Sequence, residues 1–229
     1  MLIVNLIDNQ HKIIYHIHMI PRKAENILKK MQKGYPAIAI TGPRQSGKTT
    51  LAKYIFKDKP YVSLEDLDIL DRAKNDPRSF LQRYNDGAVF DEAQRCPELF
   101  SYLQGIIDKN NKPGQFILTG SSQFGLLSGI TQSLAGRIGI IELLPFSYSE
   151  LFQCNDDVTI DEILFSGLYP PIHDKKLDPQ LWYTNYLRTY IERDVRQLIN
   201  IRNLNSFHRF VRLCAGRTGQ LLNLSLIHI

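Results

Sequence analysis

The feature that most constrains the fold of this chain is a glycine-rich segment between two apolar ones. Residues 42–49 fit the pattern G-x-x-x-x-G-K-[ST]. The preceding residues 37–41 form a short apolar run of the strand type, and residues 50–56 carry apolar side chains at helical spacing. A strand, a glycine-rich turn and a helix in this order direct successive backbone N–H groups and a helix N-terminus at one point. The sequence therefore predicts a phosphate-binding loop, or P-loop.

Each residue type in this loop has a chemical role toward a nucleotide. We expect Lys48 to reach the β- and γ-phosphates and the Thr49 hydroxyl to ligate Mg²⁺. The alternative is an ordinary turn of the same composition, and the matching flanks argue against it. The residues expected to bind the nucleotide are Gly42, Pro43, Arg44, Gln45, Ser46, Gly47, Lys48, Thr49 and Thr50.

A later apolar strand, residues 88–92, ends in the acidic pair Asp91 and Glu92. A carboxylate at this position in a P-loop protein can hold Mg²⁺, directly or through water. A second carboxylate can act as a general base toward water. We therefore expect Asp91 to bind Mg²⁺ together with Thr49, and Glu92 to polarise the attacking water. The alternative is a strand whose terminal acids are simply solvated.

Two further residues are candidates because of their positions. Ser121 lies at the hydroxyl-rich end of a strand expected over 115–122, and that end of a parallel strand faces the ligand crevice. It is a candidate sensor of the γ-phosphate or the attacking water, with an ordinary strand-end serine as the alternative. Arg137 precedes a fifth strand and could act as an arginine finger, in its own site or a neighbour's, or pair with a local acid. The expected catalytic residues are Lys48, Asp91, Glu92, Ser121 and Arg137.

The order of the patterns predicts an α/β fold. Strand and helix patterns alternate along the chain, which indicates a parallel sheet flanked by helices. A GTPase would need the motif N-K-x-D to recognise guanine. Residues 111–114 read N-K-P-G, with Gly114 at the position of the Asp. The failed guanine motif and an acid pair on a separate strand favour ATP hydrolysis. A small-molecule kinase is the alternative, to which the acid pair is less suited.

Composition narrows the class of protein. The 229 residues are 43% hydrophobic and carry a net charge of +5, enough for one core and a second small domain, and compatible with a nucleic-acid partner. The cysteines show no C-x-x-C spacing, which argues against a disulfide framework or a zinc site. No apolar run approaches the ~18–20 residues of a membrane span, and the N-terminus lacks a basic signal region. We expect a cytoplasmic protein without membrane contact. The cysteines are Cys96, Cys154 and Cys214.

Both ends of the chain differ from its interior. Residues 1–18 lack a turn that would connect them to a domain, whereas a helix with Pro21 in its first turn starts soon after Met19. We expect Met19 to be the biological start and residues 1–18 to be a non-native or disordered extension. Residues 224–229 match the translation of a sequencing-adapter end, and we expect them to be an adapter-derived tail on a truncated chain.

The C-terminal part predicts a mainly helical module. Residues 168–179, rich in proline, lysine and aspartate, suggest a connector, and 180–196 predict a long amphipathic helix. Arginines interleaved with aromatic residues could contact a nucleic-acid backbone, with a solvated or internally paired helix face as the alternative. A DNA-binding role predicts salt-dependent affinity carried by Arg188, Arg196 and Arg209. Arg202, Arg212 and Arg217 lie further along the same region.

In combination, these motifs resemble the prokaryotic AAA-type ATPases that carry a C-terminal domain of unknown function. The resemblance runs from Met19 to about Asn223 and implies a core over 19–166 that binds ATP and Mg²⁺. It further implies the start of an incomplete C-terminal module over 167–223. The segments that carry the resemblance are residues 20–23, 41–49, 91–95, 116–121, 133–137 and 143–147.

The chain departs from the family pattern in two places. An extra serine, Ser122, follows Ser121, which blurs the choice of the sensor serine. Residues 167–170 read G-L-Y-P where members usually show G-G-Y-P. The family's C-terminal part includes a nuclease-like module that would lie mostly beyond residue 229, so no nuclease activity is assigned.

The sequence as a whole predicts a Mg²⁺-dependent ATPase that couples nucleotide state to its C-terminal module. Through that module the protein could engage DNA or a protein partner. The alternative is a nucleotide-regulated interaction or DNA-binding module with little turnover. Whether the protein forms an oligomer stays open at this point.

Overall fold

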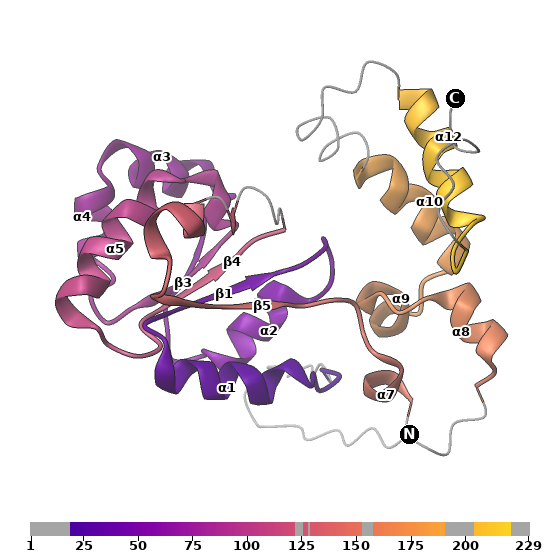
Figure 1. Cartoon of the computed structure of the whole chain (residues 1–229), viewed down its shortest axis with the longest axis horizontal. Coiled ribbons are helices and arrows are strands. Elements are labelled where there is room, and N and C mark those ends of the chain that lie inside the picture. Colours follow the sequence, from indigo (N-terminus) through magenta and orange to yellow (C-terminus); the bar gives the residue numbers. More distant parts are fainter. Residues whose placement is uncertain (1–18, 122–125, 128, 153–157, 191–203, 221–229) are drawn as a thin grey trace, which may run out of the picture.

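The computed structural model describes residues 19–121, 126–127, 129–152, 158–190 and 204–220. Its centre is a five-stranded sheet in the order β2-β3-β4-β1-β5, and every neighbouring pair of strands is parallel (Figure 1). The predicted parallel sheet is therefore confirmed. The strands are β1 (Ala37–Thr41), β2 (Tyr61–Ser63), β3 (Ala88–Asp91), β4 (Phe116–Thr119) and β5 (Ile138–Glu142).

Strand order brings the two predicted motifs to one edge of the sheet. Strand β4 lies between β1, which leads into the P-loop, and β3, which ends in Asp91. In the register, Ile40 pairs with Thr119 and Phe90 pairs with Leu118. The carboxyl ends of the three strands therefore meet at the same edge, where ligands bind in open parallel sheets.

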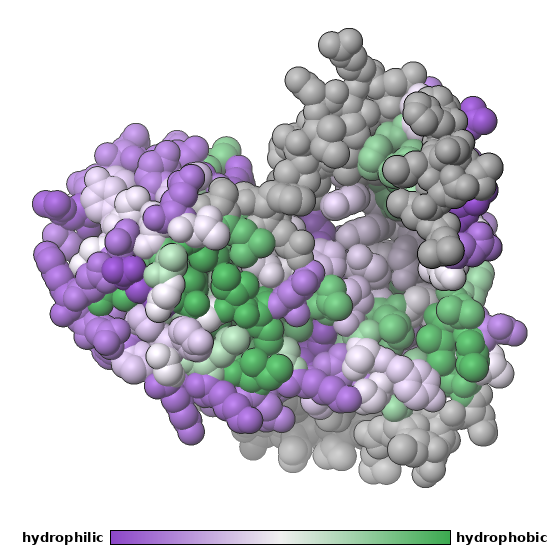
Figure 2. Space-filling view, in the orientation of Figure 1, coloured by the Kyte–Doolittle hydropathy of each residue, from purple (hydrophilic) through white to green (hydrophobic). Residues whose placement is uncertain are grey.

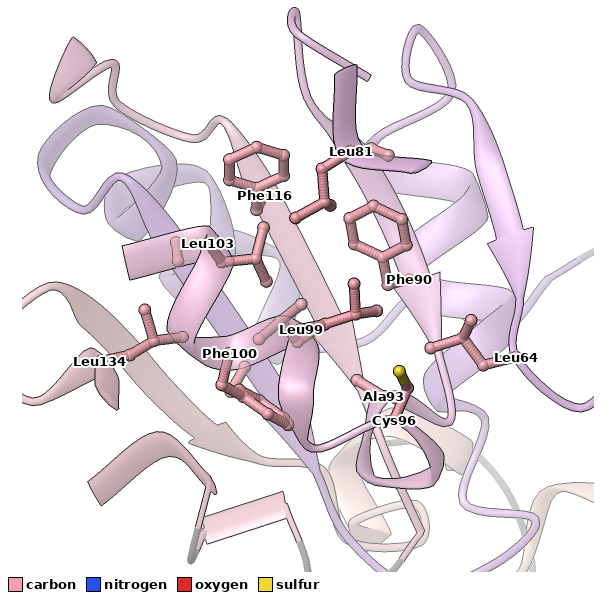
Figure 3. Packing of buried hydrophobic residues seen from close by; sticks show 14 of the residues in the cluster. Leu64, Leu81, Phe90, Ala93, Cys96, Leu99, Phe100, Leu103, Phe116 and Leu134 are labelled. Atoms are coloured by element: carbon pink, nitrogen blue, oxygen red, sulfur yellow. The ribbon is translucent and has the colours of Figure 1, made fainter. Parts of the chain in front are cut away.

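One face of the sheet carries the larger apolar core (Figure 3). Side chains alternate between the two faces of a strand, so Ala39, Phe90 and Leu118 all point to this face. They pack against three amphipathic helices, whose buried residues include Leu81 and Leu103. These helices are α3 (Leu67–Asn75), α4 (Pro77–Gln82) and α5 (Glu98–Asn110).

The opposite face is covered by α1 (Ala24–Gly34) and α2 (Lys48–Ile55). Here Ile40, Val89 and Ile117 form the second core cluster. The central strands are thus buried on both faces, as expected for a parallel sheet between helix layers. The helix layers on both faces hold the strands in place, and with them the strand ends that carry the site.

The remaining elements are helices and helical turns, most of them in the C-terminal part (Figure 1). The mainly helical C-terminal module is confirmed for the described residues. No helix in these ranges is long and apolar enough to cross a membrane. The elements are η1 (Ala93–Arg95), the π-helical turn η2 (Ile130–Leu134), α7 (Tyr148–Leu151), α8 (Ile160–Ser166), α9 (Pro170–Lys175), α10 (Pro179–Tyr190) and α12 (Leu204–Ala215).

The connector expected over residues 168–179 is wrong in part, because this segment contains helix α9. Pro170 occupies the first helical turn, where its fixed φ and its missing N–H are both tolerated. Several other predictions concern residues outside the described ranges. These are the extensions at 1–18 and 224–229, Ser122, the far end of the helix expected over 180–196, and Arg196 and Arg202.

The surface shown in Figure 2 is mostly polar over the helices that cover the sheet, with apolar side chains in several places. Figure 2 shows apolar side chains at the surface over the edge strand β5 and over α8. In β5, Ile140 is 43% exposed; in α8, Ile160 and Leu164 are about three-quarters exposed, at 75% and 76%.

Candidate nucleotide-binding site

The backbone of the loop between β1 and α2 takes conformations that favour glycine. Gly42 has φ 137° and Gly47 has φ 94°, both in the region that side chains disfavour. A Cβ at Gly42 would lie 2.2 Å from the carbonyl oxygen of Leu143, which follows β5. The loop therefore runs tightly against the exit of β5, and its first glycine is required by space as well as by φ.

Lys48 is buried over this loop. Its Nζ donates to the carbonyl oxygens of Gly42 at 3.0 Å and Pro43 at 2.7 Å. Burial lowers the pKa of Lys48 to about 8, against the opposing effect of the nearby Glu92 and Asp91 carboxylates. The enclosed Lys48 ammonium group is a compact positive charge at the N-terminus of α2.

Asp91 is the polar centre of the site. It is 6% exposed, and its carboxylate accepts a hydrogen bond from Thr49 Oγ1 at 3.0 Å and from the Tyr61 hydroxyl at 2.6 Å. The Thr119 hydroxyl of β4 donates to the same carboxylate. Three hydroxyl donors from three elements therefore fix the orientation of Asp91.

Glu92 leaves the strand with a left-handed backbone, at φ 54°. Its Oε2 accepts a hydrogen bond from Gln94 Nε2 at 2.5 Å and from Ser121 Oγ at 3.0 Å. The candidate sensor Ser121 thus contacts the candidate general base. The two donors fix the orientation of this second carboxylate.

These groups line one cavity of about 470 Å³, a size typical of small-molecule sites. From the loop, Arg44, Gln45, Gly47, Lys48, Thr49 and Thr50 line it. Gly42, Pro43 and Ser46 do not line it; the carbonyl oxygens of Gly42 and Pro43 accept from Lys48, and that of Ser46 accepts from Arg22. The other residues lining the cavity are Met19, Ile20, Arg22, Leu51, Glu65, Asp91, Glu92, Ser121, Phe146, Pro170, Pro171, Asp174 and Lys175.

The structure does not bring Arg137 to this cavity. Arg137 immediately precedes β5, and its carbonyl oxygen accepts from the N–H of Ala37 at the start of β1. It therefore lies at the amino edge of the sheet, opposite the P-loop. Its guanidinium pairs with Asp108 of α5, with 3.0 Å between Nη2 and Oδ2. This local ion pair is the alternative that the sequence left open.

Sequence reasoning assigned no role to several residues at the site. Arg22, Tyr61 and Gln94 contact the loop, Asp91 and Glu92 respectively. Asp174 and Lys175 reach the cavity from α9. Only the arginine and the glutamine lay in segments singled out by the family resemblance. The tyrosine and the two α9 residues had no local pattern that could mark them.

The oxygen donors of the site fit a magnesium ion. Thr49 and Asp91 present a hydroxyl and a carboxylate whose oxygens lie 3.0–3.1 Å apart. Hard oxygen ligands of this kind are those that Mg²⁺ prefers, typically with water and substrate phosphates completing the set. The described residues thus offer the partial set of ligands that a nucleotide-bound Mg²⁺ requires.

Comparison with known proteins agrees with this geometry. Residues 34–152 match the family described as AAA domain, and residues 157–229 match a domain of unknown function (DUF8612). The uncharacterized proteins Rv2008c of Mycobacterium tuberculosis and Mb2031c of Mycobacterium bovis are each 31% identical over 180 residues. That match covers 77% of this chain and 40% of each relative. The chain thus spans less than half the length of these relatives.

A solved structure shares the fold. The Walker-type ATPase PABY2304 of Pyrococcus abyssi superposes with a TM-score of 0.51 at 16% identity, over 78% of this chain and 77% of that one. At this identity the likeness concerns the fold alone.

Proposed function

Because the chain belongs to the AAA domain family of P-loop NTPases, we propose that it binds ATP with Mg²⁺ and hydrolyses it. The observation that carries this proposal is the content of one cavity. It holds the Lys48 cation, the Thr49–Asp91 oxygen pair and the Glu92–Ser121 pair. Phosphate binding, metal binding and water activation need these three groups close together.

In the proposed site, the loop and Lys48 bind the phosphates. Backbone N–H groups at the start of α2 and the positive end of that helix attract anions. Lys48 lies at the first residue of α2, with its Nζ on the loop carbonyls. From there it can exchange a carbonyl partner for a phosphate oxygen.

Thr49 and Asp91 would hold the metal. A bound Mg²⁺ supplies positive charge that offsets the charge of the β- and γ-phosphates. The hydroxyls of Tyr61 and Thr119 orient Asp91 for this role, since they bond its carboxylate from the two neighbouring strands. Such orienting partners behind a metal ligand tune its affinity.

Glu92 would act as the general base. Its carboxylate would take a proton from the attacking water, a role that requires a carboxylate held within hydrogen-bond reach of the substrate. Gln94 and Ser121 hold it in place. We assign Ser121 to the orientation of Glu92. An arginine-finger role for Arg137 would require a neighbouring subunit, because its guanidinium pairs with Asp108 at the opposite edge of the sheet.

Part of the cavity lining favours a purine base. Met19, Ile20, Phe146, Pro170 and Pro171 add apolar surface to the polar and charged residues of the same cavity. Apolar walls with a few placed polar groups are typical of ligand pockets. No N-K-x-D segment reads guanine in the sequence, and ATP is therefore the proposed nucleotide.

The same cavity supports the proposed coupling of nucleotide state to the C-terminal module. Pro170, Pro171, Asp174 and Lys175 reach it from α9, and the Tyr186 hydroxyl of α10 donates to the carbonyl oxygen of Arg44 at 3.4 Å. A nucleotide in the loop would thus touch both parts of the chain. Nucleotide binding would in this way bias how the C-terminal module engages DNA or a protein partner.

Steady-state phosphate release tests the proposed function. We expect Mg²⁺-dependent release from ATP, weaker or absent release from GTP, and loss of activity in Lys48→Ala, because the phosphate contact is gone. Lys29→Ala, at a lysine side chain 59% exposed on α1, is the matched control and should keep full activity. Wild-type protein that binds ATP and releases no phosphate would favour the interaction module with little turnover.

A further inference from the structure

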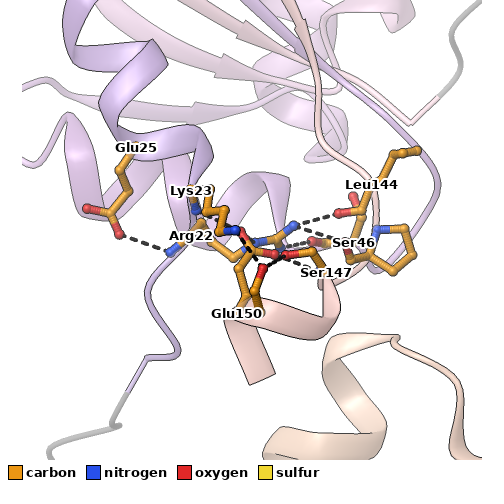
Figure 4. Close-up of polar contacts among 9 residues, drawn as sticks. Arg22, Lys23, Glu25, Ser46, Leu144, Ser147 and Glu150 are labelled. Atoms are coloured by element: carbon orange, nitrogen blue, oxygen red, sulfur yellow. Dashed lines mark hydrogen bonds and ion pairs between the residues drawn. The ribbon is translucent and has the colours of Figure 1, made fainter. Parts of the chain in front are cut away.

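Arg22 lies outside the P-loop sequence but is buried against the loop (Figure 4). It precedes α1 and is 8% exposed. Its Nη1 donates to the carbonyl oxygen of Ser46 at 2.9 Å, and its Nη2 donates to that of Leu144 at 2.6 Å. One guanidinium group therefore joins the loop after β1 to the segment after β5.

The other contacts of Arg22 hold it in that position. Its Nε pairs with Glu150 Oε1 at 3.3 Å, and both side chains are 7% exposed. Its guanidinium carbon lies 4.8 Å from the centre of the Phe146 ring. Burial opposes the charge of Glu150, but backbone hydrogen bonds from Ser147 and Lys23, together with Arg22, lower its pKa. The lowered pKa favours the carboxylate form of Glu150 beside Arg22.

The bond to Ser46 fixes the direction of the next amide. No peptide bond among the described residues is cis, so the Ser46 carbonyl and the Gly47 N–H point in opposite directions. With the carbonyl directed at Arg22, the Gly47 N–H is directed away from it. Gly47 caps the N-terminus of α2 and lines the cavity. Glycine tolerates many backbone conformations, so the positive φ of Gly47 does not by itself fix the orientation of the Ser46–Gly47 peptide plane.

We propose that Arg22 is a positioning residue for the phosphate-binding loop. It holds the Ser46 carbonyl out of the anion site and keeps the Gly47 N–H available to a phosphate of the nucleotide. The inference rests on the proposed nucleotide binding and adds to it a residue 20 positions before the first loop glycine.

Arginine is needed for this role because two carbonyls in different segments must be bonded at once. The planar guanidinium presents several N–H donors in a fixed geometry, whereas a lysine ammonium is a single point charge. Lysine at position 22 would keep the charge beside Glu150, but its single nitrogen cannot take the two separate positions from which Nη1 and Nη2 bond Ser46 and Leu144. Arg22→Lys is therefore the informative substitution.

The experiment compares ADP and AMP binding by calorimetry in wild type, Arg22→Lys and Arg22→Ala, with Lys29→Ala as the surface control. We expect Arg22→Lys to lower ADP affinity about tenfold, as for the loss of one charge-assisted hydrogen bond. AMP affinity should fall less than about twofold, because AMP brings fewer phosphates to the loop. Affinities are compared at a temperature at which thermal unfolding shows every variant to be folded, because the loss of a buried hydrogen bond also lowers stability.

Two results would overturn the inference. One is ADP affinity in Arg22→Lys equal to that of wild type. The other is an equal loss for ADP and AMP, which would indicate a general structural role. A wild-type protein that binds neither nucleotide would instead remove the proposed function itself, and this inference with it. If Arg22→Ala does not fold, the lysine variant still decides.

Discussion

At the scale of single residues, the site depends on hydroxyl groups that orient two carboxylates. The Asp91 carboxylate accepts hydrogen bonds from the hydroxyl groups of three residues that lie 28 to 42 positions away in the chain: Thr119, Tyr61 and Thr49. Such partners are set by strand order and register, which no local pattern encodes. The carboxylates themselves could be predicted, because an apolar strand that ends in two acids is a local pattern.

Tyr61 gives the first prediction at this scale. Tyr61→Phe keeps the ring beside Lys53, whose Nζ lies 3.6 Å from the ring centre, and removes the hydroxyl bonded to Asp91. We expect the Mg²⁺ concentration for half-maximal nucleotide binding to rise about tenfold, as for other residues that orient a metal ligand. Nucleotide binding without Mg²⁺ should not change.

A magnesium titration followed by a fluorescent ATP analogue checks this. Tyr54→Phe is the control, since Tyr54 is 56% exposed on α2. Identical Mg²⁺ dependence in Tyr61→Phe and wild type would show that the hydroxyl does not act through the metal ligand.

At the scale of elements, the sequence predicted the strands and the helix that carry the site, because apolar runs and apolar residues at helical spacing mark them. Strands that are apolar throughout become central strands, and helices with one apolar stripe cover them. The order of the strands could not be predicted, since any of several orders buries the same side chains. Helix α9 could not be predicted, because a proline-rich segment is typical of a connector, although proline is favourable at the first helical turn.

Cys96 provides a prediction at this scale, because it lies between η1 and α5 in the larger core. It is fully buried, and burial raises the pKa of its thiol to about 11. The thiol therefore stays protonated at pH 8, and only a thiolate reacts readily. We expect iodoacetamide at pH 8 to leave Cys96 unmodified in the folded protein and to modify it after unfolding in urea.

Peptide mapping by mass spectrometry measures the modification. Cys214, half-buried on α12, is the internal reference and should react in the folded protein. Modification of the two cysteines at equal rates would mean that the core around η1 and α5 opens easily.

At the scale of the whole molecule, the C-terminal helices meet the nucleotide site through aromatic residues. The chain has a single tryptophan, Trp182, in α10. Its ring stacks on Tyr186 at a centroid distance of 4.9 Å, and the Tyr186 hydroxyl contacts the carbonyl of Arg44 in the loop. Tyr186 therefore connects the loop to Trp182, whose fluorescence can report a change in the loop.

We predict a saturable change in Trp182 emission when ATP binds, because phosphate in the loop displaces or tightens the Arg44–Tyr186 contact. Excitation at a wavelength selective for tryptophan measures it. Lys48→Ala should show no change at the same ATP concentration, and Tyr186→Phe should show a reduced one. Unchanged emission at ATP concentrations that saturate binding in calorimetry would speak against coupling between the loop and α10.

The central claim, that Glu92 activates water for attack on ATP held by the loop, is tested most directly by a single-turnover experiment. Excess protein is mixed with labelled ATP and Mg²⁺, and ADP formation is followed in wild type and Glu92→Gln. The amide keeps the size of the side chain but cannot accept the proton. We predict that both proteins bind ATP and that the rate falls at least about 100-fold in Glu92→Gln. Equal rates in the two proteins, or no cleavage by wild type with ATP bound, would contradict the account.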